Sequence, residues 1–317
     1  MEGELQQKQE KIGSVTMDYT YYTGQDLYSD GEIEEQMLDI ARYNPPEEFP
    51  KIIEAQKSWP VFYHFSPLRT NIIDWIPFKK TDKVLEIGAG CGALTGALAR
   101  RAGSVTCIDL SRKRSMVNAY RNRNAENITI LVANFKDIEP HLDTDYDYVL
   151  LIGVFEYGQA YIGGAAPYDD FMRICDRHRK PDGRLVIAIE NKFGLKYWAG
   201  CREDHLGTYF SGLEGYHEGG AARTFTRRGL EQILDRAGIS EYAFYYPYPD
   251  YKFATNIYSD KYLPKKGELS NNLRNFDRER ILLFDETQVF DEIIEENMFP
   301  TFSNSYLLVA GSAPDVI

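Results

Sequence analysis

Residues 84–92 read Val-Leu-Glu-Ile-Gly-Ala-Gly-Cys-Gly, an apolar stretch that runs directly into three glycines at alternate positions. A short apolar run of this kind predicts a buried β-strand over 83–87. Glycine lets the backbone turn tightly and approach a ligand, because no Cβ stands in the way. A predicted helix over 92–101 follows, and its first N–H groups are free to bind a polar or negative group. The stretch therefore predicts a ligand-binding turn between a strand and a helix.

The spacing of these glycines separates the candidate ligands. The pattern is GxGxG, whereas a dinucleotide-binding turn has GxGxxG. Asp109 ends the next predicted strand, 17 residues after Gly92, where a carboxylate is placed to bind a ribose diol. No lysine with a following Ser or Thr completes the turn, which excludes a P-loop. A nucleoside ligand other than a dinucleotide is the remaining expectation.

Strands and helices then alternate along the chain. Such alternation predicts βαβ units, and therefore an α/β fold with a mostly parallel sheet covered by helices on both faces. The first 17 residues are polar and are expected to be flexible, residues 18–78 to form an N-terminal helical lid segment, and residues 79–317 one domain. That domain is expected to carry insertions at about 191–225 and 255–300. The predicted strands are 83–87, 104–108, 128–132, 148–152, 184–189, 241–246 and 305–310, and the predicted helices include 32–42, 92–101, 113–122, 169–178 and 226–237.

Four motifs in order make the stretch from about 82 to 240 resemble class I S-adenosylmethionine-dependent methyltransferases. The motifs are VLEIGAGCG, SVTCIDLS, LVANFKDI and DYDYVLLIGVFEYG, followed by KPDGRLVIAIENKFG. The third departs from the family, which often has Gly-Asp where Ala133-Asn134 stands here. The resemblance implies a Rossmann-like fold with a seven-stranded sheet and S-adenosyl-L-methionine as the cofactor.

The resemblance also implies roles for single residues. The glycines would line the methionine part of the cofactor, Glu86 would shape their loop or bind the cofactor's amino group through water, and Asp109 would hold both ribose hydroxyls. Leu110 would lie against the adenine, and Asn134 would bind the adenine edge with help from the Phe135 backbone. The implied cofactor-binding set is Glu86, Gly88, Ala89, Gly90, Gly92, Asp109, Leu110, Asn134, Phe135 and Gly153.

The cofactor motifs do not identify the catalytic residue. Ligands bind at the carboxyl ends of the strands in such folds, which points to 155–157 and 190–192. The loop 201–205 concentrates titratable groups, and a histidine of ordinary pKa suits a general base. We therefore name His205, Asp204, Glu190 and His217 as catalytic candidates. No metal site is assigned, because the spacing of Glu203, Asp204, His205 and His217 matches no strong ligand pattern.

The N-terminal segment is expected to close over cofactor and acceptor. It is rich in aromatic residues, and Arg69 could pair with a carboxylate. The family often has histidine at the position of Tyr157, so a histidine base there is in doubt. The candidate substrate or lid residues are Tyr22, Tyr28, Arg69 and Tyr157, and the alternative is that these side chains only pack the segment onto the domain.

Composition limits the partners. The 317 residues carry a net charge of −12, which disfavours nucleic acid, and the basic cluster Arg112–Arg114 with Arg121 and Arg123 fits a solvated helix face. No apolar run approaches the roughly 20 residues of a membrane span. The four cysteines form no CxxC pair, so a reducing cytoplasm is expected.

A further resemblance narrows the expected acceptor. The phrases at 63–78, 190–200 and 203–216 look like methyltransferase modules found with bacterial glycosyltransferases and polysaccharide genes. The expected function is therefore O-methylation of a small polar acceptor such as a sugar or glycoconjugate. The alternatives are a peptide, protein or N-methyltransferase, and a non-catalytic scaffold built on the cofactor fold. The sequence does not predict the oligomeric state.

Overall fold

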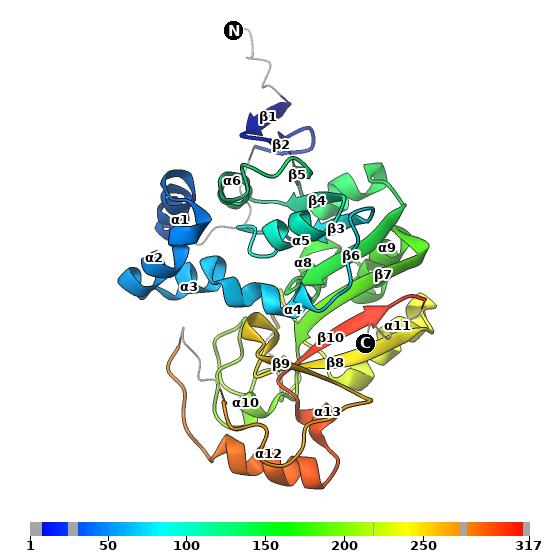
Figure 1. The fold of residues 1–317 in the computed structure, drawn as a ribbon. Helices are drawn as coiled ribbons and strands as arrows, with labels where there is room; N and C mark the ends of the chain where they lie inside the picture. The colour runs from blue at the N-terminus through cyan, green and yellow to red at the C-terminus, as the bar shows by residue number, and fades with distance from the viewer. Residues whose placement is uncertain (1–7, 25–30, 218, 273–277, 313–317) are drawn as a thin grey trace. The chain divides into compact units, whose positions relative to one another are not determined.

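The computed structural model describes residues 8–24, 31–217, 219–272 and 278–312 (Figure 1). The chain divides into two compact units, Met1–Leu150 and Leu151–Ile317. Strand β6 (Tyr146–Ile152) carries the chain from the first unit into the second. The sequence predicted one domain over 79–317 in place of this division, and each unit is described by itself below.

Parallel strands form the centre of the first unit. Strands β3 (Lys83–Ile87), β4 (Ser104–Asp109) and β5 (Ile128–Val132) pair in the order β5-β4-β3, with Glu86 opposite Cys107 and Cys107 opposite Ile130. Their inward residues are almost fully buried, as apolar strands covered on both faces require. Helices α5 (Thr95–Arg101), α6 (Arg112–Arg121) and α7 (Phe135–Ile138) follow these three strands in turn. The carboxyl ends of the strands thus all lead into the loops that carry the cofactor motifs.

The N-terminal residues expected to be flexible form a β-hairpin from Gln9 onward. Strand β1 (Gln9–Ile12) pairs antiparallel with β2 (Val15–Asp18), and β2 pairs parallel with β5. Val15 and Met17 are fully buried, so alternate apolar residues of β2 join the core. The polar composition hid this strand, because only every second residue is apolar. Residues 1–7 lie outside the described part.

Helices before the glycine turn form a second core with α6. The side chains of α1 pack with those of the short helices that follow, and with Cys91 and Val117 of the glycine turn and α6. The helix that begins at Phe49 ends at Gln56, because Lys57 adopts a left-handed backbone conformation. The helices are α1 (Glu32–Tyr43), η1 (Pro46–Glu48), α2 (Phe49–Gln56), α3 (Trp59–Phe65), η2 (Pro67–Thr70) and α4 (Asn71–Asp74), and η3 (Glu139–His141) precedes β6.

Antiparallel pairs dominate the second unit. Strand β10 (Ser305–Ala310) lies between β7 (Arg179–Glu190) and β8 (Tyr242–Tyr248), and β9 (Asn256–Ser259) pairs with β8. All six residues of β10 are buried, which agrees with its continuous apolar sequence. The helical elements are η4 (Phe155–Tyr157), α8 (Gly158–Tyr161), α9 (Pro167–Arg177), α10 (Leu195–Trp198), α11 (Arg227–Ala237), η5 (Tyr251–Phe253), α12 (Glu286–Glu295) and α13 (Phe299–Phe302).

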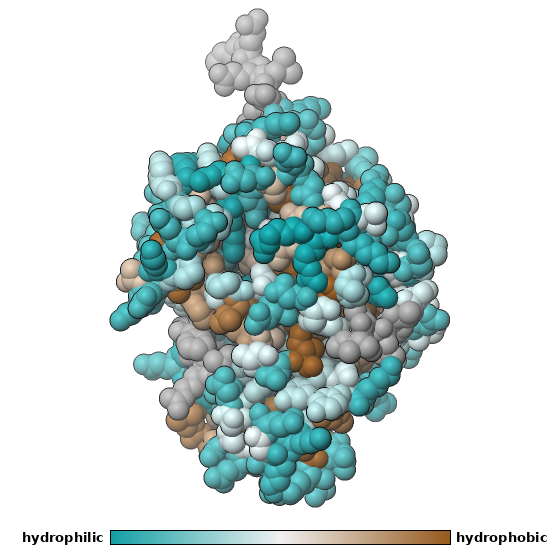
Figure 2. All heavy atoms as spheres, in the orientation of Figure 1, coloured by the Kyte–Doolittle hydropathy of each residue, from teal (hydrophilic) through white to brown (hydrophobic). Residues whose placement is uncertain are grey.

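The predicted α/β, Rossmann-like class with parallel strands and an N-terminal helical region is confirmed. The described residues form ten strands where seven were predicted, and β1, β2 and β9 are the additional ones. Hydrophilic side chains cover most of the face drawn in Figure 2, in keeping with the net charge of −12. Among the described residues, no helix has both the length and the apolar character needed to cross a membrane.

Candidate functional site

The glycine turn is hydrogen-bonded to the end of strand β4. All three glycines have positive φ, at 69° for Gly88, 52° for Gly90 and 73° for Gly92. The N–H groups of Gly88 and Ala89 both donate to the carbonyl oxygen of Ile108, at 2.8 and 3.1 Å. Residues with a Cβ rarely adopt such φ values, so the turn depends on glycine at these positions. The predicted ligand-binding turn is therefore a preformed backbone structure.

Asp109 joins the two loops that the motifs predicted to bind the nucleoside. Its Oδ2 accepts the N–H of Gly90 at 2.8 Å, and its Oδ1 accepts the N–H of Ser111 at 2.9 Å. A carboxylate has about four lone-pair positions, which are of the kind that accept hydrogen bonds from hydroxyl groups. The side chain is only half-buried. Asp109 thus orders the glycine turn and still presents oxygen atoms of the kind that a ribose diol requires.

Gly90 and Gly92 serve different needs. A Cβ on Gly92 would lie 2.2 Å from Oδ1 of Asn118 on α6, whereas a Cβ on Gly90 would meet no atom within 4 Å. Gly92 therefore permits close packing of helix α6. Gly90 faces open space, which fits a backbone that a ligand approaches. The sequence pattern alone does not make this distinction.

Glu86 lies beneath the turn. Its Oε2 accepts the hydroxyl of Thr95 at 2.6 Å and the thiol of Cys107 at 3.5 Å. Asn118 donates to the same threonine hydroxyl at 3.0 Å. Burial raises the pKa of Glu86 to about 7. The Glu86 carboxyl group therefore contacts helix α5 and strand β4, and both roles implied for it remain predictions.

The residues implied for adenine binding have mixed environments. The Oδ1 of Asn134 accepts the N–H of Lys136 at 3.1 Å and caps helix α7, and Phe135 is buried. Leu110 is half-buried. In the second unit, Gly153 leaves room for Tyr251, whose Oη would stand 2.6 Å from a Cβ there. These positions are structurally explained, and their contacts with a cofactor remain predictions.

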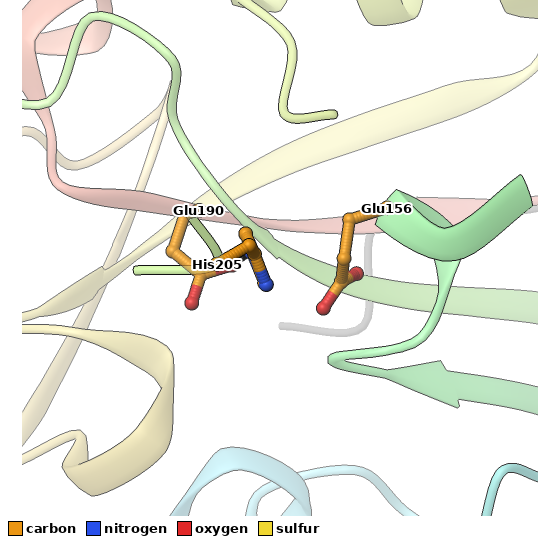
Figure 3. Close-up of side chains that lie close together, drawn as sticks. All are labelled: Glu156, Glu190 and His205. Carbon is orange, nitrogen blue, oxygen red and sulfur yellow. Dashed lines mark ion pairs between the residues drawn. The ribbon is translucent and has the colours of Figure 1, made fainter. Parts of the chain in front are cut away.

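Three polar side chains of the second unit converge near the carboxyl end of β7. Glu190 ends that strand, Glu156 belongs to η4, and His205 comes from the long insertion (Figure 3). One ligating atom from each lies within 4.8 Å of the other two. His205 Nε2 is 3.5 Å from Glu190 Oε2, and its Nδ1 is 3.2 Å from the hydroxyl of Tyr157. Both glutamates are almost fully buried.

Two lysines hold the surrounding carboxylates in place. Lys252 pairs with Oε1 of Glu190 and, at 2.9 Å, with Asp204. Lys196 lies 2.8 Å from Asp204 and 2.9 Å from Asp250. The Tyr197 hydroxyl also donates to Asp204 at 2.5 Å. The predicted catalytic candidate Asp204 is thus engaged by three cationic or hydroxyl groups and holds the lysines in position.

The surroundings shift the pKa values of Glu156 and Glu190 in opposite directions. Burial, together with the neighbouring Glu190, raises the pKa of Glu156 to about 8. Burial also opposes ionisation of Glu190, but the charge of Lys252 and the contact with His205 lower its pKa below the usual range. Burial lowers the pKa of His205, whereas the contact with Glu190 and the nearby carboxylates raise it to about 9. His205 therefore carries a proton at neutral pH in this state and does not fit the expectation of an ordinary pKa.

Other predicted residues stand apart from this cluster. His217 is exposed and is not a member of the cluster among the residues described. Tyr22 lies after the N-terminal hairpin, where its N–H donates to the carbonyl of Tyr19. Arg69 is buried, with its guanidinium 4.3 Å from the ring centroid of Tyr63. Tyr28 lies outside the described residues.

The basic cluster of α6 holds the N-terminal helices. Arg114 pairs with the buried Glu34 at 2.9 Å, and Lys113 pairs with Glu35 at 2.8 Å. The guanidinium groups at the end of the helix donate to main-chain carbonyl groups of the same segment, Arg121 to His64 at 2.5 Å and Arg123 to Arg42 at 2.9 Å. The expectation of a solvated helix face was wrong, because these side chains make contacts within the chain.

Sequence reasoning missed the two lysines and left Glu156 outside the named catalytic set. Lys252 lies in the stretch predicted as a loop after β8, and no motif marks it. Its position follows from the fold, because η5 brings it against Glu190, 62 residues earlier in the chain. Glu156 could have been named as a candidate from the sequence, because it follows the carboxyl end of the predicted strand that became β6.

Comparisons with known proteins agree with the glycine turn and the strands that follow it. The family model described as a methyltransferase domain matches residues 85–187, about a third of the chain. The demethylmenaquinone methyltransferase of Tropheryma whipplei (strain Twist) is 31% identical over 107 residues, which cover 34% of this chain and 41% of that protein. A ubiquinone biosynthesis O-methyltransferase of Pseudomonas savastanoi pv. phaseolicola (strain 1448A / Race 6) is 23% identical over 140 residues, 44% of this chain and 57% of that protein.

A solved SAM-dependent methyltransferase from Archaeoglobus fulgidus aligns with a TM-score of 0.44 at 14% identity, over 87% of this chain and 98% of that one. The matched segments span 41% and 57% of the curated relatives' length. Residues 85–187 thus match a methyltransferase domain, and the motifs in them are those of class I methyltransferases that depend on S-adenosylmethionine. S-adenosyl-L-methionine is thus the methyl donor for which Gly88–Gly92 and Asp109 are the candidate site.

Proposed function

We propose that the whole chain is an S-adenosylmethionine-dependent methyltransferase (EC 2.1.1.-) that methylates an oxygen atom of a small polar acceptor. The observation that carries the proposal is the preformed glycine turn, in which Oδ2 of Asp109 accepts the N–H of Gly90. This turn lies within the residues that match a methyltransferase domain. A turn kept only for packing would not need open space at Gly90.

The polar cluster of Glu156, Glu190 and His205 supports a polar acceptor. Buried polar atoms are costly unless they are hydrogen-bonded, and Oε2 of both glutamates and Nε2 of His205 make no hydrogen bond with a described residue. Hydroxyl groups of an acceptor could provide such bonds. In the reaction, the acceptor oxygen bonds to the methyl carbon as the carbon–sulfur bond breaks, and the hydroxyl proton leaves. S-adenosylhomocysteine is the other product.

The names of the relatives favour oxygen as the accepting atom, since one of them is an O-methyltransferase. A sugar or glycoconjugate remains our preferred acceptor class because of its many hydroxyl groups, although neither named relative bears a glycosyltransferase or polysaccharide name. A peptide, protein or amine acceptor is the alternative. Each of these acceptor classes would give a product in which the methyl group is held by a different kind of bond.

Calorimetric titration with S-adenosylmethionine and with S-adenosylhomocysteine tests the cofactor. We expect micromolar binding of both. Radiolabelled methyl transfer to sugar nucleotides, catechols and peptides then tests the acceptor, because ether, amine and ester products differ in stability to base. Absence of cofactor binding would favour the scaffold alternative, and labelling of amines alone would remove the O-methylation proposal.

A further inference from the structure

Three buried polar atoms in the second unit face one another. They are Oε2 of Glu156, Oε2 of Glu190 and Nε2 of His205. None makes a hydrogen bond with a residue that the structure describes, and the last two lie 3.5 Å apart as an ion pair. One ligating atom from each of the three residues lies within 4.8 Å of the other two (Figure 3). The exposed fraction is 1% for Glu156 and 0% for Glu190. Two carboxylate oxygens and one imidazole nitrogen that point to a common space are a donor set for a cation.

The charges around this space also favour a cation. The side chains around this space include five carboxyl groups, two lysines and one histidine, and a buried excess of carboxyl groups is unfavourable unless protons or positive charge compensate it. A divalent ion supplies that charge in one place. The carboxyl groups belong to Glu156, Glu190, Glu203, Asp204 and Asp250, and the basic groups to Lys196, Lys252 and His205.

We propose that Glu156, Glu190 and His205 bind one divalent metal ion. Mixed carboxylate and imidazole ligands suit Mn²⁺, Fe²⁺ and Zn²⁺, and three protein ligands leave coordination positions open for water or an acceptor. Ligand atoms that share one ion lie about 3 Å apart. Side-chain rotations that move each ligating atom by about 1 Å would bring the three atoms to that spacing. The set differs from the residues that the sequence considered for a metal, because only His205 is common to both.

Neighbouring side chains orient two of the three ligands. The Tyr157 hydroxyl contacts Nδ1 of His205 at 3.2 Å, so that in the neutral imidazole with a proton on Nδ1 the Nε2 lone pair would bind the ion. Lys252 binds Oε1 of Glu190 and leaves Oε2 for the ion. Metal ligands in proteins are commonly held in this way by hydrogen bonds to their second atom. The arrangement thus has the outer contacts that a metal centre needs.

The use of the ion, though not its binding, rests on the proposed function. A divalent ion that binds the acceptor hydroxyl lowers the pKa of that hydroxyl, as it does for bound water. The hydroxyl then releases its proton to solvent, and its oxygen takes the methyl group from the sulfonium. The reaction stays balanced, since the ion changes neither charge nor ligands over the full cycle.

Titration of the metal-stripped full chain with Mn²⁺ tests the proposal. Calorimetry and the loss of the free Mn²⁺ electron paramagnetic resonance signal should both report one ion per chain. We expect Glu190→Gln and Glu156→Gln to weaken binding about 100-fold, since each removes a charged ligand. Glu156→Gln is the safer variant for folding, because Glu190→Gln also removes the partner of Lys252. Asp169→Asn is the matched control, as its carboxylate lies in the same unit but pairs with Arg236 at 2.6 Å.

Thermal melting of each variant confirms folding, and S-adenosylmethionine titration of the same samples separates the two proposals. Absence of Mn²⁺ binding at about 1 mM in a protein that binds the cofactor would overturn the metal site alone. Mn²⁺ binding that both glutamate variants retain would overturn it as well. Mn²⁺ binding without cofactor binding would support the metal site and remove the proposed function.

Discussion

The glycine turn of the first unit and the polar cluster of the second are organised in opposite ways. The turn is local, because Gly88, Gly90 and Gly92 are neighbours and Asp109 ends the adjacent parallel strand. The cluster is assembled from Glu156, Glu190, His205 and Lys252, which are spread over almost a hundred residues. The turn uses main-chain conformation, and the cluster uses buried charge. A glycine turn can therefore be predicted from a motif, whereas a cluster of buried charges depends on tertiary structure.

The largest expected effect tests the cluster. We predict that His205→Ala lowers turnover about 1,000-fold, within the range for loss of a group that handles protons or orients the acceptor. The affinity for S-adenosylmethionine should change less than about threefold, since the residue has no part in the glycine turn. Steady-state kinetics and calorimetry on one preparation measure both quantities. His217→Ala, at an exposed position, is the control and should keep its rate.

An unchanged turnover in His205→Ala would remove the cluster from the reaction. A matching loss of cofactor affinity would break the comparison instead, because the two regions would then act as one site.

The second effect tests the turn. Asp109→Ala should weaken S-adenosylmethionine binding about 100-fold, because the variant loses the ribose acceptor and also the bond to the Gly90 N–H. Calorimetry measures the loss. Asp137→Ala, an exposed carboxylate on α7, serves as the control. Near-native affinity in Asp109→Ala would contradict the assignment of this motif.

The third prediction concerns the pH dependence of stability that arises from Glu86, which lies beneath the turn. Burial raises the pKa of Glu86 from 4.5 to about 7, so the folded state holds this proton more tightly than the unfolded state. The contribution of Glu86 to stability is therefore complete below about pH 4.5 and is lost as the pH rises through about 7. We predict that Glu86→Gln removes about 2 kcal/mol of this pH dependence between pH 5 and 7.

Urea unfolding at several pH values measures this term. Glu126→Gln, an exposed control, should leave the slope unchanged. Equal slopes in Glu86→Gln and the native chain would show that Glu86 ionises normally in the folded state.

The fourth prediction concerns two glycines of the turn that have different surroundings. Gly92→Ala should lower the free energy of unfolding by about 2 kcal/mol, because its Cβ would meet Asn118 at 2.2 Å and φ is positive. Gly90→Ala has the same backbone penalty without the collision, so its stability loss should be about half as large, while its cofactor affinity falls more. Thermal melting and calorimetry separate the two. Equal stability losses would mean that Asn118 moves away at little cost.

Sequence periodicity predicted the central strands closely, because each is a short apolar run bounded by turn residues. Strands β3, β5 and β10 have the predicted bounds. The hairpin at Gln9–Asp18 was missed, since only Val15 and Met17 of its second strand are buried among polar neighbours. Helix α12 was expected only as a partly helical insertion, because acidic residues obscure the apolar side of the helix.

The candidate site was predictable in the same uneven way. Glycines with positive φ can be recognised in the sequence, because few other residues can replace them. Lys252 cannot be recognised in the sequence, since nothing distinguishes it from other loop lysines. Its role depends on the fold, which buries it against Glu190. His205 was predicted from its residue type, but its raised pKa arises from carboxylates that are distant in sequence. Burial and charge are properties of the folded chain.

The N-terminal hairpin has a consequence for how the first unit behaves in solution. Strand β2 covers the side of β5 that faces away from β4, through register pairs such as Met17 with Ile130. An uncovered strand there would offer free N–H and C=O groups to another molecule, which is the usual beginning of edge-to-edge aggregation. The first described residues therefore protect the parallel sheet from self-association. A shortened chain that begins at the predicted domain boundary would lose that protection together with the strand.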